Sequence, residues 1–190
     1  MTAYFDNAAT TRVCPEAADT AYRIMTEGFG NPGSTHKMGR DAKAVLDDSR
    51  AKLAKALGAQ PEELFFTSGG TESDNWAIRS GAEHMKRLGR HIISSPAEHM
   101  AVLRALELLE KDGFTVTRLR PEADGSVTAQ AVADALREDT VLVTLMMVNN
   151  ETGGITDIAA VARAIKKSGS RARLHTDAVQ GFLKLPFSAK

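Results

Sequence analysis

The sequence has a single cysteine and no excess of charge, and each shortage excludes a class of protein. Cys14 is the only cysteine among 190 residues. An intramolecular disulfide framework and a cysteine-rich zinc or iron–sulfur site are therefore excluded. Because 24 Lys and Arg residues balance 24 Asp and Glu residues, the formal net charge is zero. This excludes a protein-wide basic field for nucleic acid, and we expect no nucleic-acid partner.

Long apolar runs are missing as well. The longest runs, such as residues 141–148, are no longer than a strand, so we expect no segment that spans a bilayer. The first residues (Met-Thr-Ala-Tyr-Phe-Asp) have neither the basic region nor the apolar stretch of a signal peptide. One thiol fits a reducing compartment. We therefore expect a soluble, cytoplasmic protein without a membrane partner.

Helical and strand patterns alternate along the chain. Hydrophobic residues make up 43% of the sequence, which is enough to build a core. Repeated strand-then-helix units predict an α/β fold, a single domain with a mainly parallel sheet and helices on both faces. The expected helices cover residues 35–58, 71–88, 100–112, 128–137 and 156–168. The expected strands cover residues 64–67, 91–94, 115–119, 141–148 and 174–176.

A glycine-containing turn lies between the first predicted strand and the helix that follows it. Residues 67–73 read Thr-Ser-Gly-Gly-Thr-Glu-Ser. Glycines allow a ligand to approach the backbone closely, and the free N–H groups of a helix N-terminus favour an anion. The alternative is a tight turn with a helix cap. The segment is not a Walker A loop, because no Gly-Lys-Ser/Thr follows.

Three further polar clusters follow predicted strands, where ligands bind in open α/β sheets. Glu98 and His99 follow the second strand, and an isolated histidine there is also typical of a helix cap. Residues 149–154 (Asn-Asn-Glu-Thr-Gly-Gly) follow the most apolar strand, where a polar turn is the alternative. Residues 175–180 (His-Thr-Asp-Ala-Val-Gln) place Asp177 at the end of the last strand. A His-x-Asp metal pair lacks further ligands at matching spacing, so we expect no metal site.

In this order, the motifs resemble the class V branch of pyridoxal-phosphate enzymes, most closely the cysteine desulfurases of the NifS/IscS type. The resemblance covers essentially the whole chain in register. It includes a Tyr-Phe-Asp-Asn-Ala-Ala-Thr-Thr segment near the start, an Asn-Pro-Gly-Ser-Thr-His turn and the four clusters above. The matching segments are residues 4–11, 31–36, 67–75, 98–99, 148–153 and 175–180.

The resemblance implies the large domain of a fold type I enzyme and a role for each of six residues toward pyridoxal 5′-phosphate. Gly70 and Thr71 would hold the phosphate. Asp177 would pair with the pyridinium nitrogen and keep it protonated, so that the ring can accept electrons. His99 would stack on the ring and help to move protons. The residues expected near the cofactor 3-oxygen and the substrate are Asn150 and Gln180.

The family reaction converts L-cysteine to L-alanine. An enzyme cysteine, acting as thiolate, takes the sulfur as a persulfide and passes it to an acceptor protein of iron–sulfur assembly or tRNA thiolation. The family forms homodimers. Two alternatives stay open: another class V reaction, such as that of a selenocysteine lyase or an aminotransferase, and a non-catalytic remnant or binding module.

The covalent machinery of the family has no match in this sequence. The Schiff-base lysine of the family lies in a Ser-x-His-Lys motif, which does not occur among the 190 residues. Cys14 precedes a helix and is expected to be structural. Residues 1–190 are therefore expected to be the N-terminal part of the large domain, incomplete and inactive alone. Lys37, Lys184 and Lys190 stay open as adventitious sites of cofactor attachment.

Overall fold

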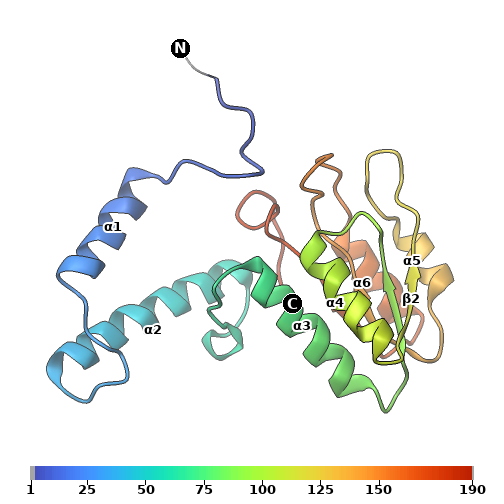
Figure 1. Ribbon diagram of the computed structural model, residues 1–190, viewed down its shortest axis with the longest axis horizontal. Coiled ribbons are helices and arrows are strands. Elements are labelled where there is room, and N and C mark those ends of the chain that lie inside the picture. The colour runs from blue at the N-terminus through green and yellow to red at the C-terminus, as the bar shows by residue number, and fades with distance from the viewer. Residues whose placement is uncertain (1–2, 190) are drawn as a thin grey trace. The chain divides into compact units, whose positions relative to one another are not determined.

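The computed structural model describes residues 3–189. The chain divides into two compact units (Figure 1). One unit runs up to Phe66 and includes the segment from Pro186 onward, and the other is Thr67–Leu185. All six predicted site residues belong to the second unit. Among the described residues, no helix combines the length and the apolar character needed to cross a bilayer.

The first unit contains two helices and a short 3-10 turn. Helix α1 (Pro15–Thr26) begins at a proline, whose missing N–H costs nothing in the first turn. Helix α2 (Lys37–Leu57) is capped by the His36 side chain, which accepts a hydrogen bond from the amide of Gly39. It ends at Gly58, whose φ of 69° suits a residue without a Cβ. The 3-10 turn η1 is Pro61–Glu63. The helix expected over residues 35–58 is confirmed.

The strand expected at residues 64–67 is wrong. This segment pairs with none of the four strands in the described chain. Its apolar residues suggested a buried strand, but the segment contacts the side chain of Arg50 on α2 instead of a partner strand. Arg50 donates a hydrogen bond to the carbonyl of Leu64, and its guanidinium lies 4.8 Å from the centre of the Phe66 ring.

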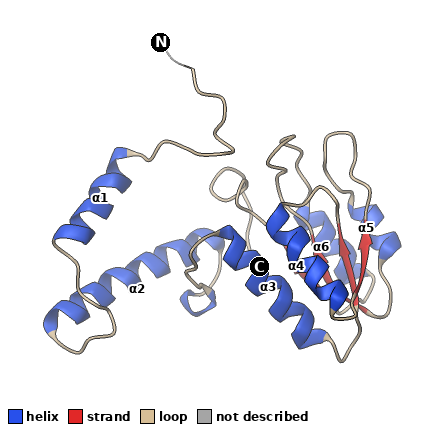
Figure 2. Ribbon diagram, viewed as in Figure 1, coloured by secondary structure: helices blue, strands red, loops and turns tan. Residues whose placement is uncertain are grey.

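The second unit is built around a parallel sheet of four strands in the order β2-β1-β3-β4. All three strand pairs are parallel. Four helices connect and flank the strands (Figures 1 and 2). The elements in chain order are α3 (Gly70–Met85), β1 (His91–Ser94), α4 (Met100–Lys111), β2 (Thr115–Arg118), α5 (Ala129–Ala135), β3 (Thr140–Thr144), α6 (Ile158–Lys167) and β4 (Arg173–His175).

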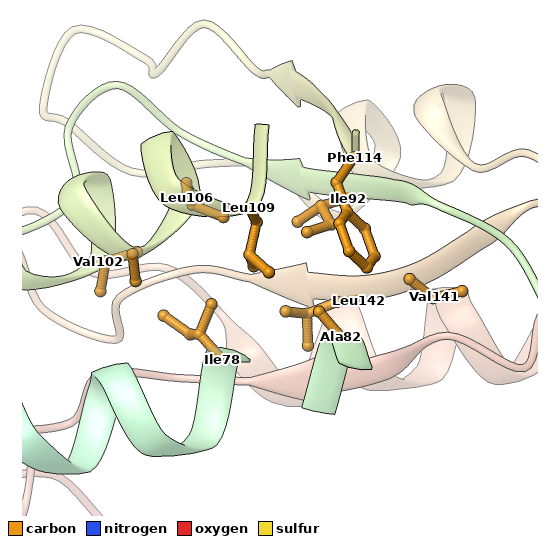
Figure 3. Packing of buried hydrophobic residues seen from close by; sticks show 10 residues of the cluster. Ile78, Ala82, Ile92, Val102, Leu106, Leu109, Phe114, Val141 and Leu142 are labelled. Atoms are coloured by element: carbon orange, nitrogen blue, oxygen red, sulfur yellow. The ribbon is translucent and has the colours of Figure 1, made fainter. Parts of the chain in front are cut away.

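Helices cover both faces of this sheet, as the sequence predicted. Successive strand residues point to opposite faces. Ile92 and Leu142 pack on one face against α3 and α4, which contribute side chains such as Ile78 and Leu106 (Figure 3). On the other face, Ile93 and Val143 pack with residues of α5 and α6 such as Val132, Val161 and Ile165. The central strands β1 and β3 are buried along their whole length, which explains the apolar residues at their centres.

Several element ends differ from the prediction, and two of the differences concern polar side chains. Strand β3 ends at Thr144 rather than at residue 148. Beyond it, the amide of Met146 donates to the Glu98 side chain rather than to a neighbouring strand. Helix α6 begins at Ile158, two residues later than expected, and is capped by Asp157, whose side chain accepts from the amide of Ala160 at 2.8 Å. Thr128 caps α5 as predicted.

Candidate functional site

The predicted site residues lie at one edge of the parallel sheet. The carboxyl ends of β1, β3 and β4 meet at this edge, which is where ligands bind in open α/β folds. Gly70 and Thr71 open helix α3, and His99 is the residue before helix α4. The loop after β3 carries Asn150, and the turn after β4 carries Asp177 and Gln180.

Helix α3 begins without a side-chain cap. Its N-cap residue is Gly69, and no side-chain hydrogen bond caps the first turn. Ser68, one residue earlier, directs both its amide and its hydroxyl to the Glu72 carboxylate at 2.7 Å. An anion would therefore meet the N–H groups at the start of α3, because uncapped amides and the helix dipole favour negative charge. Thr71 is exposed and its hydroxyl is accessible.

A close approach joins this turn to the segment that carries Asp177. A Cβ added at Gly70 would lie 2.9 Å from Cγ2 of Val179. Side chains essentially never tolerate such a distance without movement. A larger residue at position 70 would therefore displace the Val179 side chain, and the start of α3 lies directly beside the turn that follows β4.

Asp177 is a buried carboxyl group, with 8% of its surface exposed. One oxygen accepts a hydrogen bond of 2.9 Å from the amide of Val179. Burial raises the pKa of Asp177, and the Val179 hydrogen bond opposes this rise. The charge of Asp74 raises the pKa further, whereas the charges of His99 and His175 lower it. A cationic N–H group on a ligand would stabilise the charged form of this carboxyl.

His99 is exposed and serves as the cap of helix α4. Its Nδ1 atom accepts a hydrogen bond of 3.2 Å from the amide of Ala101. Because Nδ1 is the acceptor, the neutral ring carries its proton on Nε2. The capping role that we weighed for an isolated histidine is therefore confirmed. It also holds the ring at the sheet edge, close enough for its charge to act on Asp177.

The loop after β3 is organised by Asn149 rather than by Asn150. Asn149 is buried, and its Nδ2 donates to the carbonyl of Ala97 at 2.9 Å. Its Oδ1 accepts from the amides of Glu151 and Thr152. The half-buried Asn150 takes part in none of the side-chain hydrogen bonds found in the described part of the chain.

The lysines considered as attachment sites lie in different places. Lys37 pairs with Asp41 on α2, with 2.6 Å between Nζ and Oδ2. Lys184 donates to Oε1 of Gln180 at 3.1 Å, which places an amine beside one predicted site residue. Lys190 lies outside the described residues.

Two buried acids beneath the site received no role from sequence reasoning. Glu98 and Asp74 are only 6% and 5% exposed. Burial raises the pKa of Glu98 to about 8, the amide of Met146 opposes this rise, and the charges of Asp177 and Asp74 add to it. The sequence did contain a signal for both acids, because Asp74 lies in the matching segment 67–75 and Glu98 in the matching segment 98–99.

His175 joins Asp74 to the sheet. Its Nε2 lies 3.5 Å from Oδ1 of Asp74, which belongs to α3. Its Nδ1 lies 2.8 Å from the hydroxyl of Thr144 on β3. This histidine therefore links the helix that opens with Gly70 to strands β3 and β4. No group of three side chains able to hold a metal ion is found between residues 3 and 189, so His175 and Asp177 gain no further metal ligand there.

The residues present fit pyridoxal 5′-phosphate. The uncapped N-terminus of α3 suits a phosphate. The buried carboxyl of Asp177 suits a protonated ring nitrogen. The exposed imidazole of His99 offers a flat surface for an aromatic ring.

Comparisons with known proteins identify the family of this chain. The family model for aminotransferase class V matches residues 3–190. The putative cysteine desulfurase IscS 1 of Bacillus subtilis (strain 168) is 44% identical over 187 residues, covering 98% of this chain and 49% of that protein. The cysteine desulfurase IscS of Methanosarcina thermophila is 43% identical, with 98% of this chain and 46% of that protein covered.

Solved structures show the same relationship. A NifS-like protein superposes with a TM-score of 0.94 at 41% identity, covering all of this chain and 52% of the other. DndA from Streptomyces lividans gives a TM-score of 0.85 at 45% identity, covering 97% of this chain and 51% of the other. The chain thus spans about half the length of the relatives it matches. It belongs to the aminotransferase class V family, a family of pyridoxal-phosphate-dependent proteins, and has the fold of the NifS-like members.

Proposed function

We propose that the protein carrying this chain is a cysteine desulfurase that converts L-cysteine to L-alanine. The sulfur passes to a cysteine of the enzyme as a persulfide and then to an acceptor protein for iron–sulfur assembly or tRNA thiolation. In this proposal, residues 1–190 are the N-terminal part of the cofactor-binding large domain. The observation that carries it is the buried Asp177 carboxyl, held beside the Gly70 turn and within the electrostatic reach of His99.

Each residue has a definite task in this proposal. The first amides of α3, at Gly70 and Thr71, would hold the phosphate group. Asp177 would keep a proton on the ring nitrogen, and His99 would lie against the ring with Nε2 available to move a proton. Asn150 and Gln180 would orient the substrate side of the site. When bound, pyridoxal phosphate supplies an electron sink for the bond that breaks at the substrate α-carbon.

The wider setting is also part of the proposal. The relatives are named cysteine desulfurases, which supports L-cysteine as substrate. A homodimer and a sulfur-acceptor partner follow from the family resemblance. The cytoplasm is proposed because the single cysteine of this chain fits a reducing compartment.

The product analysis of the complete protein tests the proposed reaction. We expect equal amounts of L-alanine and reducible sulfur from L-cysteine in the presence of a thiol. Asp177→Asn, which keeps the shape but not the charge, should reduce the rate by at least about a hundredfold, as loss of a key electrostatic contact does in other enzymes. The matched control is Glu107→Gln on the surface of α4, which should not change the rate.

Other products would point to the alternatives. Transfer of the amino group to an oxo acid, without release of sulfur, would identify an aminotransferase. A strong preference for L-selenocysteine would identify a selenocysteine lyase. No turnover of any of these, with no retained cofactor, would identify a non-catalytic member of the family.

A further inference from the structure

Glu98 belongs to the loop that carries His99, and its side chain is bonded to the backbone beside Asp177. It directly precedes His99, and its Oε1 accepts a hydrogen bond of 2.9 Å from the amide of Met146. The next amide, that of Met147, donates to the carbonyl of Asp177 at 2.9 Å. Two successive amides after β3 therefore reach both segments. The Met146 amide donates to the Glu98 side chain, and the Met147 amide donates to the backbone carbonyl of Asp177.

The surroundings of Glu98 favour the neutral acid. The residue is 94% buried, and its Oε2 atom has no hydrogen-bond partner within residues 3–189. The charges that act on it most are those of Asp177, after β4, and Asp74, on α3, which are of the same sign as a Glu98 carboxylate. The nearby histidines, His99 and His175, act on Asp177. A buried, unpaired carboxylate between two acids is strongly disfavoured.

We propose that Glu98 is a positioning residue, which ties the loop of His99 to the backbone that holds Asp177 and so fixes the separation between the His99 imidazole and the Asp177 carboxyl. The inference rests on the proposed function, because the separation matters to a ligand that touches both side chains. Glu98 does not touch the ligand. It acts through the loop that carries His99 and through the Met146–Met147 backbone.

Two substitutions separate this role from general packing. Glu98→Gln keeps an acceptor for the Met146 amide and stays neutral at every pH. Glu98→Ala removes the acceptor and leaves that amide buried without a partner. Glu107→Gln serves as the control, since Glu107 lies on the surface of α4 and pairs with Arg104.

The first measurement needs no cofactor. Hydrogen exchange of the Met146 amide, followed by NMR in the full chain, reports directly on the anchor. In Glu98→Ala we expect exchange faster by about tenfold to a hundredfold, because a buried donor has lost its partner. Glu98→Gln and Glu107→Gln should stay within about threefold of the wild type, since both keep the hydrogen bond. Unchanged exchange in Glu98→Ala would overturn the proposal.

The second measurement is the binding of pyridoxal phosphate, followed by absorbance after equilibrium dialysis. Glu98→Ala should bind about tenfold more weakly, and Glu98→Gln should restore most of the affinity, because it rebuilds the anchor. A glutamine variant as weak as the alanine variant would overturn the proposal. If the wild type does not bind the cofactor, the proposed function fails, while the exchange measurement still decides whether Glu98 anchors the loop.

Discussion

The buried carboxyl of Glu98 makes a quantitative prediction for stability against pH. Its pKa rises from an ordinary 4.5 to about 8 in the folded protein. The folded chain therefore keeps a proton that the unfolded chain releases. The free energy of unfolding falls as pH rises through this window, because the unfolded state binds fewer protons there. The contribution is fully present below pH 4.5 and fully lost above pH 8.

The magnitude follows from the two pKa values. At about 1.36 kcal/mol for each pH unit, the rise from 4.5 to about 8 corresponds to about 5 kcal/mol across the window. By pH 7 about 3 kcal/mol of it is already lost. This is a large share of the stability of an ordinary domain, which is about 5 to 15 kcal/mol.

Glu98→Gln isolates this contribution, because glutamine keeps the acceptor but has no proton to lose. Urea unfolding of both proteins at pH 5, 7 and 9 gives the difference in unfolding free energy at each pH. We expect the unfolding free energy of Glu98→Gln, relative to that of the wild type, to rise by about 3 to 5 kcal/mol between pH 5 and pH 9. His91, whose pKa is lowered, titrates in both proteins and is not among the groups that act on Glu98, so its contribution cancels. A difference that does not change with pH would refute the reasoning.

Three further predictions concern the sheet and the site. His91 is fully buried and bonds Thr140 and Thr117 at 2.8 Å, so His91→Ala should cost about 3 kcal/mol in urea unfolding. Burial lowers the His91 pKa below 6.5, so the stability of the wild type relative to that of the variant should fall as pH drops below this value; equal acid profiles would contradict this. Asn149→Asp keeps the acceptor for the loop amides but loses the donor to Ala97, so it should lower the unfolding free energy by about 1 to 3 kcal/mol; no loss would show that this bond is dispensable. Gly70→Ala should weaken pyridoxal phosphate binding, and adding Val179→Ala should restore it, because the added Cβ meets Cγ2 of Val179 at 2.9 Å; failure of this rescue in a dialysis assay would assign the effect elsewhere.

The fold could be predicted from the sequence because its helices and strands have strong local patterns. The apolar run that became β3 and the cap at Thr128 lie within single short segments. Residues 64–67 were mistaken for a strand because a short apolar run does not reveal whether a partner strand exists. The hydrogen bond from Arg50 to Leu64 joins residues 14 positions apart, and no local pattern shows it.

The motifs of the candidate site could be located from the sequence, whereas their contacts could not. Gly70, His99 and Asp177 follow from their positions at strand ends together with the family resemblance. The anchoring roles of Glu98 and Asn149 depend on partners 48 and 52 residues away. Only the folded sheet brings those partners together, so the sequence placed these residues in the right motifs without their roles.

The most direct test of the account is the affinity of the complete protein for pyridoxal phosphate, with and without the Asp177 charge. Equilibrium dialysis with absorbance detection measures both proteins under the same conditions. The account predicts that the wild type retains the cofactor and that Asp177→Asn binds it at least about tenfold more weakly, because the protonated ring nitrogen loses its partner. Equal affinities, or a wild type that retains no cofactor, would contradict the assignment of this sheet edge as the cofactor site.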